Sequence, residues 1–273
     1  MIDVHCHLNL HKFDEDFDEA ITKASEKGVE IIINTGTSIP SSRKAIDLAH
    51  IYDNLYAIVG IHPHHADKTD RKFEGELQVD WLEKLRIMME EPKVVGVGEI
   101  GMDYFQYKSN GVVEKRLQEE VFVQQIELAH TYNKPIQIHN RLAGEDVIRI
   151  LKDHKQLLKH NYPGMFHCFA GTIQVLNAAL DLGFMIGFDG NITYPGFAPK
   201  ETVMLSELAK LTPIERIVTE TDSPFLSPIP FRGSRNEPSH VILVGEFLAE
   251  IKGVSFKEIN QQTTQNAKTL FGL

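Results

Sequence analysis

Residues 1–7, which read MIDVHCH, carry two histidines two residues apart, and this pair is the most informative feature of the chain. Side chains alternate between the two faces of a strand, so His5 and His7 point to one side and Cys6 to the other. Two imidazoles side by side at the end of a strand supply half of a metal site. The candidates for the other half each follow a later apolar run, and they are Glu99, His139, His167 and Asp222.

The apolar runs alternate with amphipathic segments of helical period. Such an alternation predicts βαβ units and a parallel sheet, and eight units match a (β/α)₈, or TIM, barrel. Ser255 and Glu258 form a capping-box pattern that opens one further helix. The predicted strands lie at 2–4, 29–34, 55–61, 93–98, 135–138, 163–167, 184–188 and 214–219, and the predicted helices near 14–27, 40–51, 74–90, 111–131, 143–155, 172–182, 198–210, 237–251 and 255–271.

We expect residues 1–273 to form a single barrel domain with this extra C-terminal helix. The structural alternative is an open doubly wound sheet, but no glycine-rich fingerprint follows the first strand. The apolar fraction of 42% and the charged fraction of 24% are those of a soluble globular protein. No run of about 18 apolar residues predicts a membrane span, and no secretory signal is visible.

The cysteines and the net charge restrict the partners and the compartment. Cys6 and Cys168 lie beside candidate ligand histidines on separate predicted strands, so we expect buried thiols rather than a disulfide, and a cytoplasmic protein. The net charge of −10 argues against a broad basic surface for nucleic acid. A pocket with two divalent cations and two carboxylates would still be positive by about two charges, which suits a phosphate.

Six of the eight predicted strand ends carry groups for metal binding or acid–base chemistry, and barrel active sites lie at these ends. Six ligands are too many for one tetrahedral zinc and suit two ions that share a carboxylate. Glu99 is the expected bridge, because its strand lies between strand one and strands five and six. Asp222 follows strand eight, next to strand one in a closed barrel. The predicted sets are therefore His5, His7, Asp222 and Glu99 for one ion, and Glu99, His139 and His167 for the other.

Seven short motifs follow one another from residue 3 to residue 238, so they span nearly the whole chain. They are DVHCHL at 3–8, GIHPH at 60–64, GEIGMDY at 98–104, PIQIHNR at 135–141, HCFAG at 167–171, ETDSP at 220–224 and RGSRNEP at 232–238. Together they resemble the motifs of the TatD family of metal-dependent deoxyribonucleases, in the amidohydrolase-like group of barrels. The resemblance implies a divalent metal centre with the same six ligands and hydrolysis of DNA phosphodiesters, often from the 3′ end. Ala170 departs from the family, which often has Ser there.

The site residues receive the following expected roles. Asp222 accepts the proton of the attacking water, with Glu99 as the other catalytic group. His64 contacts the substrate phosphate. Arg141 clamps it, unless it pairs with a loop carboxylate. Asp103 and Tyr104 are expected on the loop after strand four. Tyr104 stacks on a base or sugar, unless it only packs there.

The expected cofactors are two divalent ions. Four histidines favour zinc or manganese, and iron as well, over magnesium, although magnesium can support activity at a weak site. The expected partner is DNA or another nucleotide phosphodiester, with no membrane and no obligate protein partner. His62 is expected to support the site from behind, because Pro63 interrupts the strand ladder. Glu220 either orients a ligand histidine or lies in the barrel interior.

Two rival functions remain open. One is an amidohydrolase that cleaves an amide, ester or aminoacyl bond in the same barrel. Many such barrels carry a modified lysine on strand four, but here Glu99 occupies that place and Lys93 lies at the opposite end of the strand. The other rival is a binding protein on an inactive barrel, which the intact set of six ligands argues against.

Overall fold

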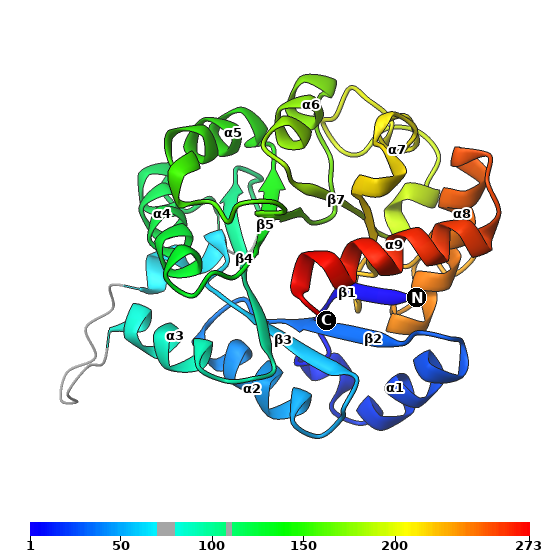
Figure 1. The fold of residues 1–273 in the computed structure, drawn as a ribbon, viewed down its shortest axis with the longest axis horizontal. Helices are drawn as coiled ribbons and strands as arrows, with labels where there is room; N and C mark the ends of the chain where they lie inside the picture. The colour runs from blue at the N-terminus through cyan, green and yellow to red at the C-terminus, as the bar shows by residue number, and fades with distance from the viewer. Residues whose placement is uncertain (70–79, 108–110) are drawn as a thin grey trace.

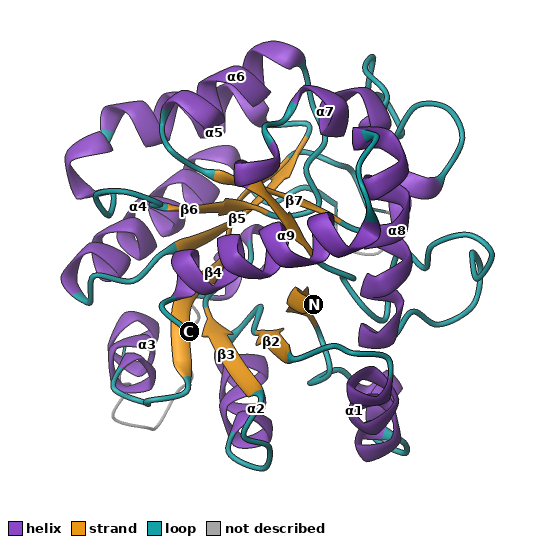
Figure 2. Ribbon diagram, turned by 45° about the vertical axis from the view of Figure 1, so that its right-hand side comes forward, coloured by secondary structure: helices purple, strands orange, loops and turns teal. Residues whose placement is uncertain are grey.

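The computed structural model describes residues 1–69, 80–107 and 111–273. An eight-stranded parallel sheet runs in the order of the sequence, with the helices around its outside (Figures 1 and 2). The strands are β1 (Ile2–Cys6), β2 (Ile31–Thr35), β3 (Leu55–Val59), β4 (Val94–Asp103), β5 (Ile136–Arg141), β6 (Gly164–Phe166), β7 (Met185–Phe188) and β8 (Ile217–Thr219). The α-helices are α1 (Phe17–Glu26), α2 (Ile39–Ala49), α3 (Trp81–Met89), α4 (Lys115–Thr131), α5 (Gly144–Asp153), α6 (Ile173–Asp181), α7 (Leu205–Leu211), α8 (Val241–Lys252) and α9 (Phe256–Phe271). Short 3₁₀ turns are η1 (His11–Phe13), η2 (Pro63–Lys68), η3 (Lys155–Leu157), η4 (Gly190–Thr193), η5 (Ile214–Arg216) and η6 (Pro238–His240).

The sheet closes between β1 and the segment that follows β8. Cys6 and Ser223 form a parallel bridge there. The Asp222 N–H donates to the His5 carbonyl at 2.9 Å, and the His7 N–H donates to the Ser223 carbonyl at 2.7 Å. The predicted barrel is therefore confirmed, and its closure brings Asp222 beside the histidines of β1.

Helix α9 covers the end of the barrel where the strands begin (Figure 1). Its residues Ala267, Leu270 and Phe271 pack in one buried cluster with strand residues such as Ile2 and Met165. A second, larger apolar cluster fills the space between the strands and the surrounding helices. Because one end is sealed by apolar packing, the polar strand ends are left at the opposite end, where barrel enzymes place their sites.

Two strands contain one extra residue in a stretch that includes a predicted ligand, which is His5 on β1 and Glu99 on β4. Asp3 pairs with Ile32 but Cys6 with Asn34, so β1 has an additional residue relative to β2. On β4 the same irregularity precedes Ile100 and includes Glu99. Such bulges redirect side chains. Here they let a strand change from apolar interior packing to presenting a metal-binding group.

Some predicted boundaries were wrong. Asp103 was expected on a loop, but β4 continues through it because β4 and β5 stay paired as far as Asp103 and Arg141. The Gln118 side chain of α4 also bonds to both the N–H and the carbonyl of Asp103. The helix expected near 198–210 begins only at Leu205. Residues 74–79 of the helix expected near 74–90 lie outside the described residues.

Within the described ranges, no helix combines the length and the apolar character needed to cross a membrane. The thiols of Cys6 and Cys168 are both free. The side chain of Cys6 faces the outer apolar cluster and donates to the Ile33 carbonyl, so it points away from His5 and His7, as the strand alternation predicts.

Candidate metal centre

All six predicted ligands converge at the open end of the barrel, around Glu99. The Oε1 atom of Glu99 lies 2.6 Å from His139 Nδ1 and 2.9 Å from His167 Nε2. Its Oε2 atom lies 3.9 Å from His5 Nε2 and 3.7 Å from His7 Nε2. The two oxygens of one buried carboxylate therefore face two separate histidine pairs, which is the geometry that a bridging ligand requires.

His5, on β1, and His7, directly after β1, are held with the same ring nitrogen toward the centre. His5 Nδ1 lies 2.7 Å from Gln137 Oε1. The amide of Gln137 donates to the Val4 carbonyl, so its oxygen is the atom that accepts from His5. His7 Nδ1 lies 2.9 Å from the Thr35 carbonyl, which can only accept. Both Nδ1 atoms therefore carry hydrogens, and both Nε2 lone pairs are free for a ligand role.

These two free nitrogens lie only 3.0 Å apart. Asp222 Oδ1 is close to both, at 3.5 Å from His5 Nε2 and 3.3 Å from His7 Nε2. Two lone pairs and a carboxylate oxygen at this separation repel one another unless a proton or a cation lies between them. The donor set, two imidazoles and one carboxylate, fits a divalent transition metal such as zinc.

His139 presents its Nδ1 atom to the centre, whereas His5 and His7 present Nε2. Its Nε2 atom lies 3.0 Å from Asp103 Oδ2, so Nδ1 is left toward Glu99 and toward His167 Nε2 at 3.2 Å. Burial lowers the pKa of His139, but Asp103 and Glu99 outweigh burial and raise it to about 10. A cation held by His139 Nδ1 and Glu99 would replace the proton that this pKa reflects. A carboxylate behind a ligand histidine fixes its tautomer and orientation.

Asp222 is the predicted ligand that follows β8. Burial would raise the pKa of its carboxyl, but the adjacent His5 and His7, where a positive charge favours the ionised carboxylate, hold it well below the usual range. Its backbone is in the left-handed region, with a φ of 54°. A non-glycine residue held there is strained, and such residues cluster at functional sites.

His62 lies beside the cluster but in the wrong tautomer for a ligand. Its Nδ1 atom accepts from the His64 N–H at 3.1 Å, so its neutral ring carries the hydrogen on Nε2. That Nε2 lies 3.4 Å from Glu99 Oε1 and can only donate toward it. Groups of possible ligands that include His62 therefore do not fit a cation, although His62, Glu99 and His139 are close enough to form one. This supporting position is what the sequence predicts for His62.

The predicted substrate contacts lie at different distances from this centre. His64 Nε2 is 3.1 Å from Asp103 Oδ2, at the edge of the cluster. Arg141 donates to the Tyr107 hydroxyl at 2.6 Å, and its guanidinium lies 4.0 Å from the centre of the Phe105 ring. Tyr104 points its hydroxyl to Asp146 of α5, 2.7 Å away. The structure thus brings His64 to the ligands and places Arg141 and Tyr104 farther out.

Three residues that support the ligands have no role in the sequence analysis. They are Gln137 behind His5, Thr35 behind His7 and Asp103 behind His139. Gln137 is two residues before His139 on β5, so both face the same side of the strand. A polar residue between Ile136 and Ile138 was the available signal. The carbonyl of Thr35 gives no signal in a sequence.

Behind the ligands lies a second group of acids, the interior carboxyl cluster, which consists of Asp3, Asp189 and Glu220. Burial raises the pKa of Asp3 to about 8 and that of Asp189 to about 7. Burial, followed by the charge of Asp189, raises the pKa of Glu220 well above its usual range. Glu220 accepts a short hydrogen bond from the Cys168 N–H, so it lies in the barrel interior, one of the two expected positions.

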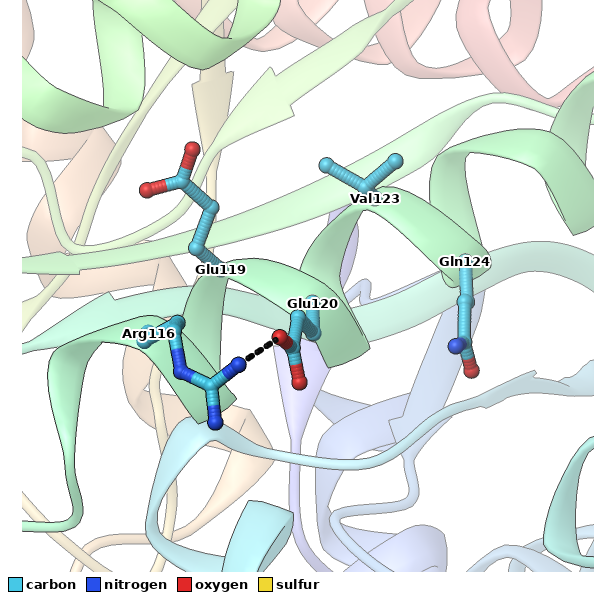
Figure 3. A pocket seen from close by; sticks show the side chains of 5 residues that line it. All are labelled: Arg116, Glu119, Glu120, Val123 and Gln124. Atoms are coloured by element: carbon cyan, nitrogen blue, oxygen red, sulfur yellow. Dashed lines mark hydrogen bonds and ion pairs between the residues drawn. The ribbon is translucent and has the colours of Figure 1, made fainter.

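Figure 3 shows a separate pocket on the surface of α4. It is lined by Arg116, Glu119, Glu120, Val123 and Gln124. Arg116 is already paired with Glu120 at 3.0 Å, and this pocket contains none of the ligand residues. It carries no chemistry comparable to the strand ends.

Known metal-dependent hydrolases are similar to this chain along nearly its whole length. The family model described as "TatD related DNase" matches residues 2–272. An uncharacterized metal-dependent hydrolase of Bacillus subtilis, YabD, is 40% identical over 99% of this chain and 98% of its own length. A 3′-5′ ssDNA/RNA exonuclease TatD of Pantoea ananatis is 31% identical, with both chains fully covered.

Solved structures agree with these relatives. The crystal structure of YjjV, a TatD homologue from Escherichia coli, superimposes with a TM-score of 0.87 at 29% identity and covers 100% of this chain and 98% of that one. A β-aspartyl dipeptidase from Fervidobacterium islandicum shares only the fold, with a TM-score of 0.60 at 15% identity over 72% of its chain. The chain described here belongs to the TatD-related DNase family of metal-dependent hydrolases.

Proposed function

We propose that this protein is a metal-dependent phosphodiesterase that cleaves DNA, as an exonuclease working from the 3′ end with two divalent ions. The single observation that carries the proposal is the division of the Glu99 oxygens between two histidine pairs. One carboxylate facing two donor sets favours a pair of ions over a single one. Zinc or manganese suits the four imidazoles, and magnesium suits them less well.

The ions, when bound, polarise a phosphoryl oxygen and lower the pKa of water near neutrality. The protein's own groups do the rest. Asp222 keeps its charge at neutral pH, lies at the edge of the ligand set and accepts the proton of the attacking water. Gln137 and Thr35 hold the rings of His5 and His7 so that no reorganisation is needed during the reaction.

The substrate phosphate is expected on the side of β3 and β5. His64 is the nearest proposed contact, because it lies beside Asp103 at the edge of the cluster. Arg141 is held by Tyr107 and Phe105, which keeps its guanidinium extended for a phosphate farther along the strand. Tyr104 stays a proposed contact for a base or sugar; Lys115 lies 3.6 Å from the centre of its ring.

A relative of known activity supports the substrate class. The Pantoea ananatis enzyme, whose sequence aligns with the whole of this chain, is a 3′-5′ exonuclease on single-stranded DNA and RNA. Amide or ester hydrolysis in the same barrel is the alternative. Lys93 argues against its usual lysine bridge, because its Nζ donates to the Tyr52 and Asp53 carbonyls, away from Glu99.

A substrate panel with metal-reconstituted protein tests the proposal. The panel contains single- and double-stranded DNA, RNA, and small esters and amides, with the 3′ or 5′ end labelled. We expect two metal ions per chain by elemental analysis and stepwise shortening of single-stranded DNA from its 3′ end, both lost after chelation. Faster turnover of amides than of any nucleic acid would instead support the amidohydrolase alternative.

A further inference from the structure

Phe225 is held at the mouth of the metal centre with its ring in solvent. Its N–H donates to the Asp222 carbonyl at 2.9 Å, and its carbonyl accepts from Asn236 Nδ2 at 2.7 Å. Asn236 is fully buried, and the same Nδ2 also donates to the Thr221 carbonyl. These hydrogen bonds therefore fix the backbone of Phe225. The residue is nevertheless 45% exposed, and its ring centre lies 6.2 Å from that of His7.

A cation is held beside this ring. Lys12 Nζ lies 5.6 Å from the centre of the Phe225 ring. The Lys12 carbonyl accepts from Arg235, which also pairs with Asp16, so the segment after β1 is tied to the loop after β8. Among the described residues, no carboxylate forms an ion pair with Lys12. Its charge is therefore available to an anionic group that lies next to Phe225.

Phe231 in the same loop shows that this exposure is not a general property of the loop. It is also 45% exposed, but its ring stacks on the ring of His240 with a centre-to-centre distance of 4.6 Å and an angle of 8°. One face of Phe231 is thus already covered by a ring. Phe225 meets His7 only at an edge, with an angle of 68° between the rings.

We propose that Phe225 and Lys12 form a subsite for one unpaired nucleobase and the phosphate attached to it, on the His5–His7–Asp222 side of the centre. This inference rests on the proposed phosphodiesterase function. An aromatic platform with an adjacent cation is how single strands are bound without sequence preference. A base in a duplex is already stacked and paired, so this subsite selects a single-stranded or frayed end. It also lets a protein of net charge −10 hold a polyanion at a few points.

The test compares strands that differ only in one base. KM is measured on single-stranded oligonucleotides with a normal or an abasic terminal residue, for the wild type, Phe225→Ala, Phe225→Trp and the equally exposed control Phe231→Ala. We expect the wild type to prefer the base-carrying end by roughly tenfold, the size of one stacking contact. Phe225→Ala should lose this preference, while Phe225→Trp and Phe231→Ala keep it.

Lys12 is tested by binding rather than by turnover. A strand with a terminal 2-aminopurine is titrated into metal-loaded Asp222→Asn protein across salt concentrations, and its fluorescence reports stacking. Adding Lys12→Gln should make the slope of log affinity against log salt shallower by about 0.7, the value for one phosphate on a single strand. Adding Phe225→Ala should abolish the fluorescence quenching.

The two proposals fail in different ways. If metal-loaded wild type cleaves no strand at all, the phosphodiesterase function is wrong and the subsite falls with it. If the wild type cleaves strands but Phe225→Ala retains the preference for a base, or Phe231→Ala loses it equally, only the subsite is overturned.

Discussion

Acids in two clusters of the same barrel behave oppositely. One is the candidate metal-ligand cluster, which consists of His5, His7, Glu99, His139, His167 and Asp222, and the other is the interior carboxyl cluster. Asp222 and Glu220 are two residues apart in the sequence; Glu220 is fully buried, and the side chain of Asp222 is only 13% exposed. The pKa of Asp222 is held low by His5 and His7. The pKa of Glu220 is raised by burial and by Asp189. Burial alone therefore does not set the charge of an acid; the neighbours that can donate or carry positive charge decide it.

The opposite pKa shifts indicate different roles for the acids of the two clusters. Asp222 and Glu99 are held ionised, as a cation bound among them would require. In the interior carboxyl cluster Asp3 and Glu220 are largely protonated near neutral pH and Asp189 partly so, which limits the negative charge behind the candidate site. Pairs of acids with opposite environments are a recurring way to divide roles in enzyme sites.

The largest expected effect comes from exchanging each acid of this pair for its amide. Asp222→Asn keeps the shape but removes the charge and the proton acceptor, so we expect kcat to fall at least about 100-fold. Glu220→Gln resembles the protonated acid already present, so its kcat should stay within about threefold of the wild type. Steady-state kinetics on a single-stranded oligonucleotide measures both. An equal loss in the two variants would remove the distinction between the clusters.

A smaller effect is expected at Asp103, the carboxylate behind His139. Asp103→Asn weakens the acceptor that fixes His139 Nε2, so metal affinity should fall roughly 10- to 100-fold. Competition with a chromophoric chelator measures this affinity directly. Asp146→Asn is the matched control, because Asp146 accepts from a tyrosine hydroxyl and from no ligand histidine. Unchanged affinity in Asp103→Asn would mean that packing alone orients His139.

The smallest effect concerns stability and pH at Asp3. Its pKa of about 8 in the folded state lies above the ordinary value of 3.8, so folding binds a proton in this range. The stabilisation is complete below about pH 4 and is lost as the pH rises toward 8. Asp3→Asn should therefore flatten the fall in stability between pH 5 and pH 8, measured by urea denaturation.

In Asp3→Asn the fall in stability with rising pH should be smaller than in the wild type but should not disappear. The raised pKa values of Asp189 and Glu220 produce a fall in the same direction. The exposed substitution Asp47→Asn serves as the control. A slope in Asp3→Asn as steep as that of the wild type would show that Asp3 is already ionised in the folded protein.

Strand periodicity predicted the barrel correctly, and the barrel brings the six candidate ligands together at one end. His5 and His7 share a face because alternation is a property of any strand, and His139, His167 and Asp222 follow apolar runs that are visible in the sequence. Asp103 was misplaced on a loop because nothing local marks where β4 stops. Its pairing with β5 and the bonds from Gln118, fifteen residues away, extend the strand.

Periodicity and residue chemistry are local properties, so the amino-acid sequence was enough to predict the order of strands and helices and six residues able to bind metal. Tertiary contacts were needed to show which ring nitrogen each histidine presents, which oxygen of Glu99 faces which histidine pair, and why Asp222 is charged while Glu220 is not. Those properties depend on acceptors such as Gln137 and the Thr35 carbonyl, which come from other strands. They exist only once the barrel has closed and water has been excluded.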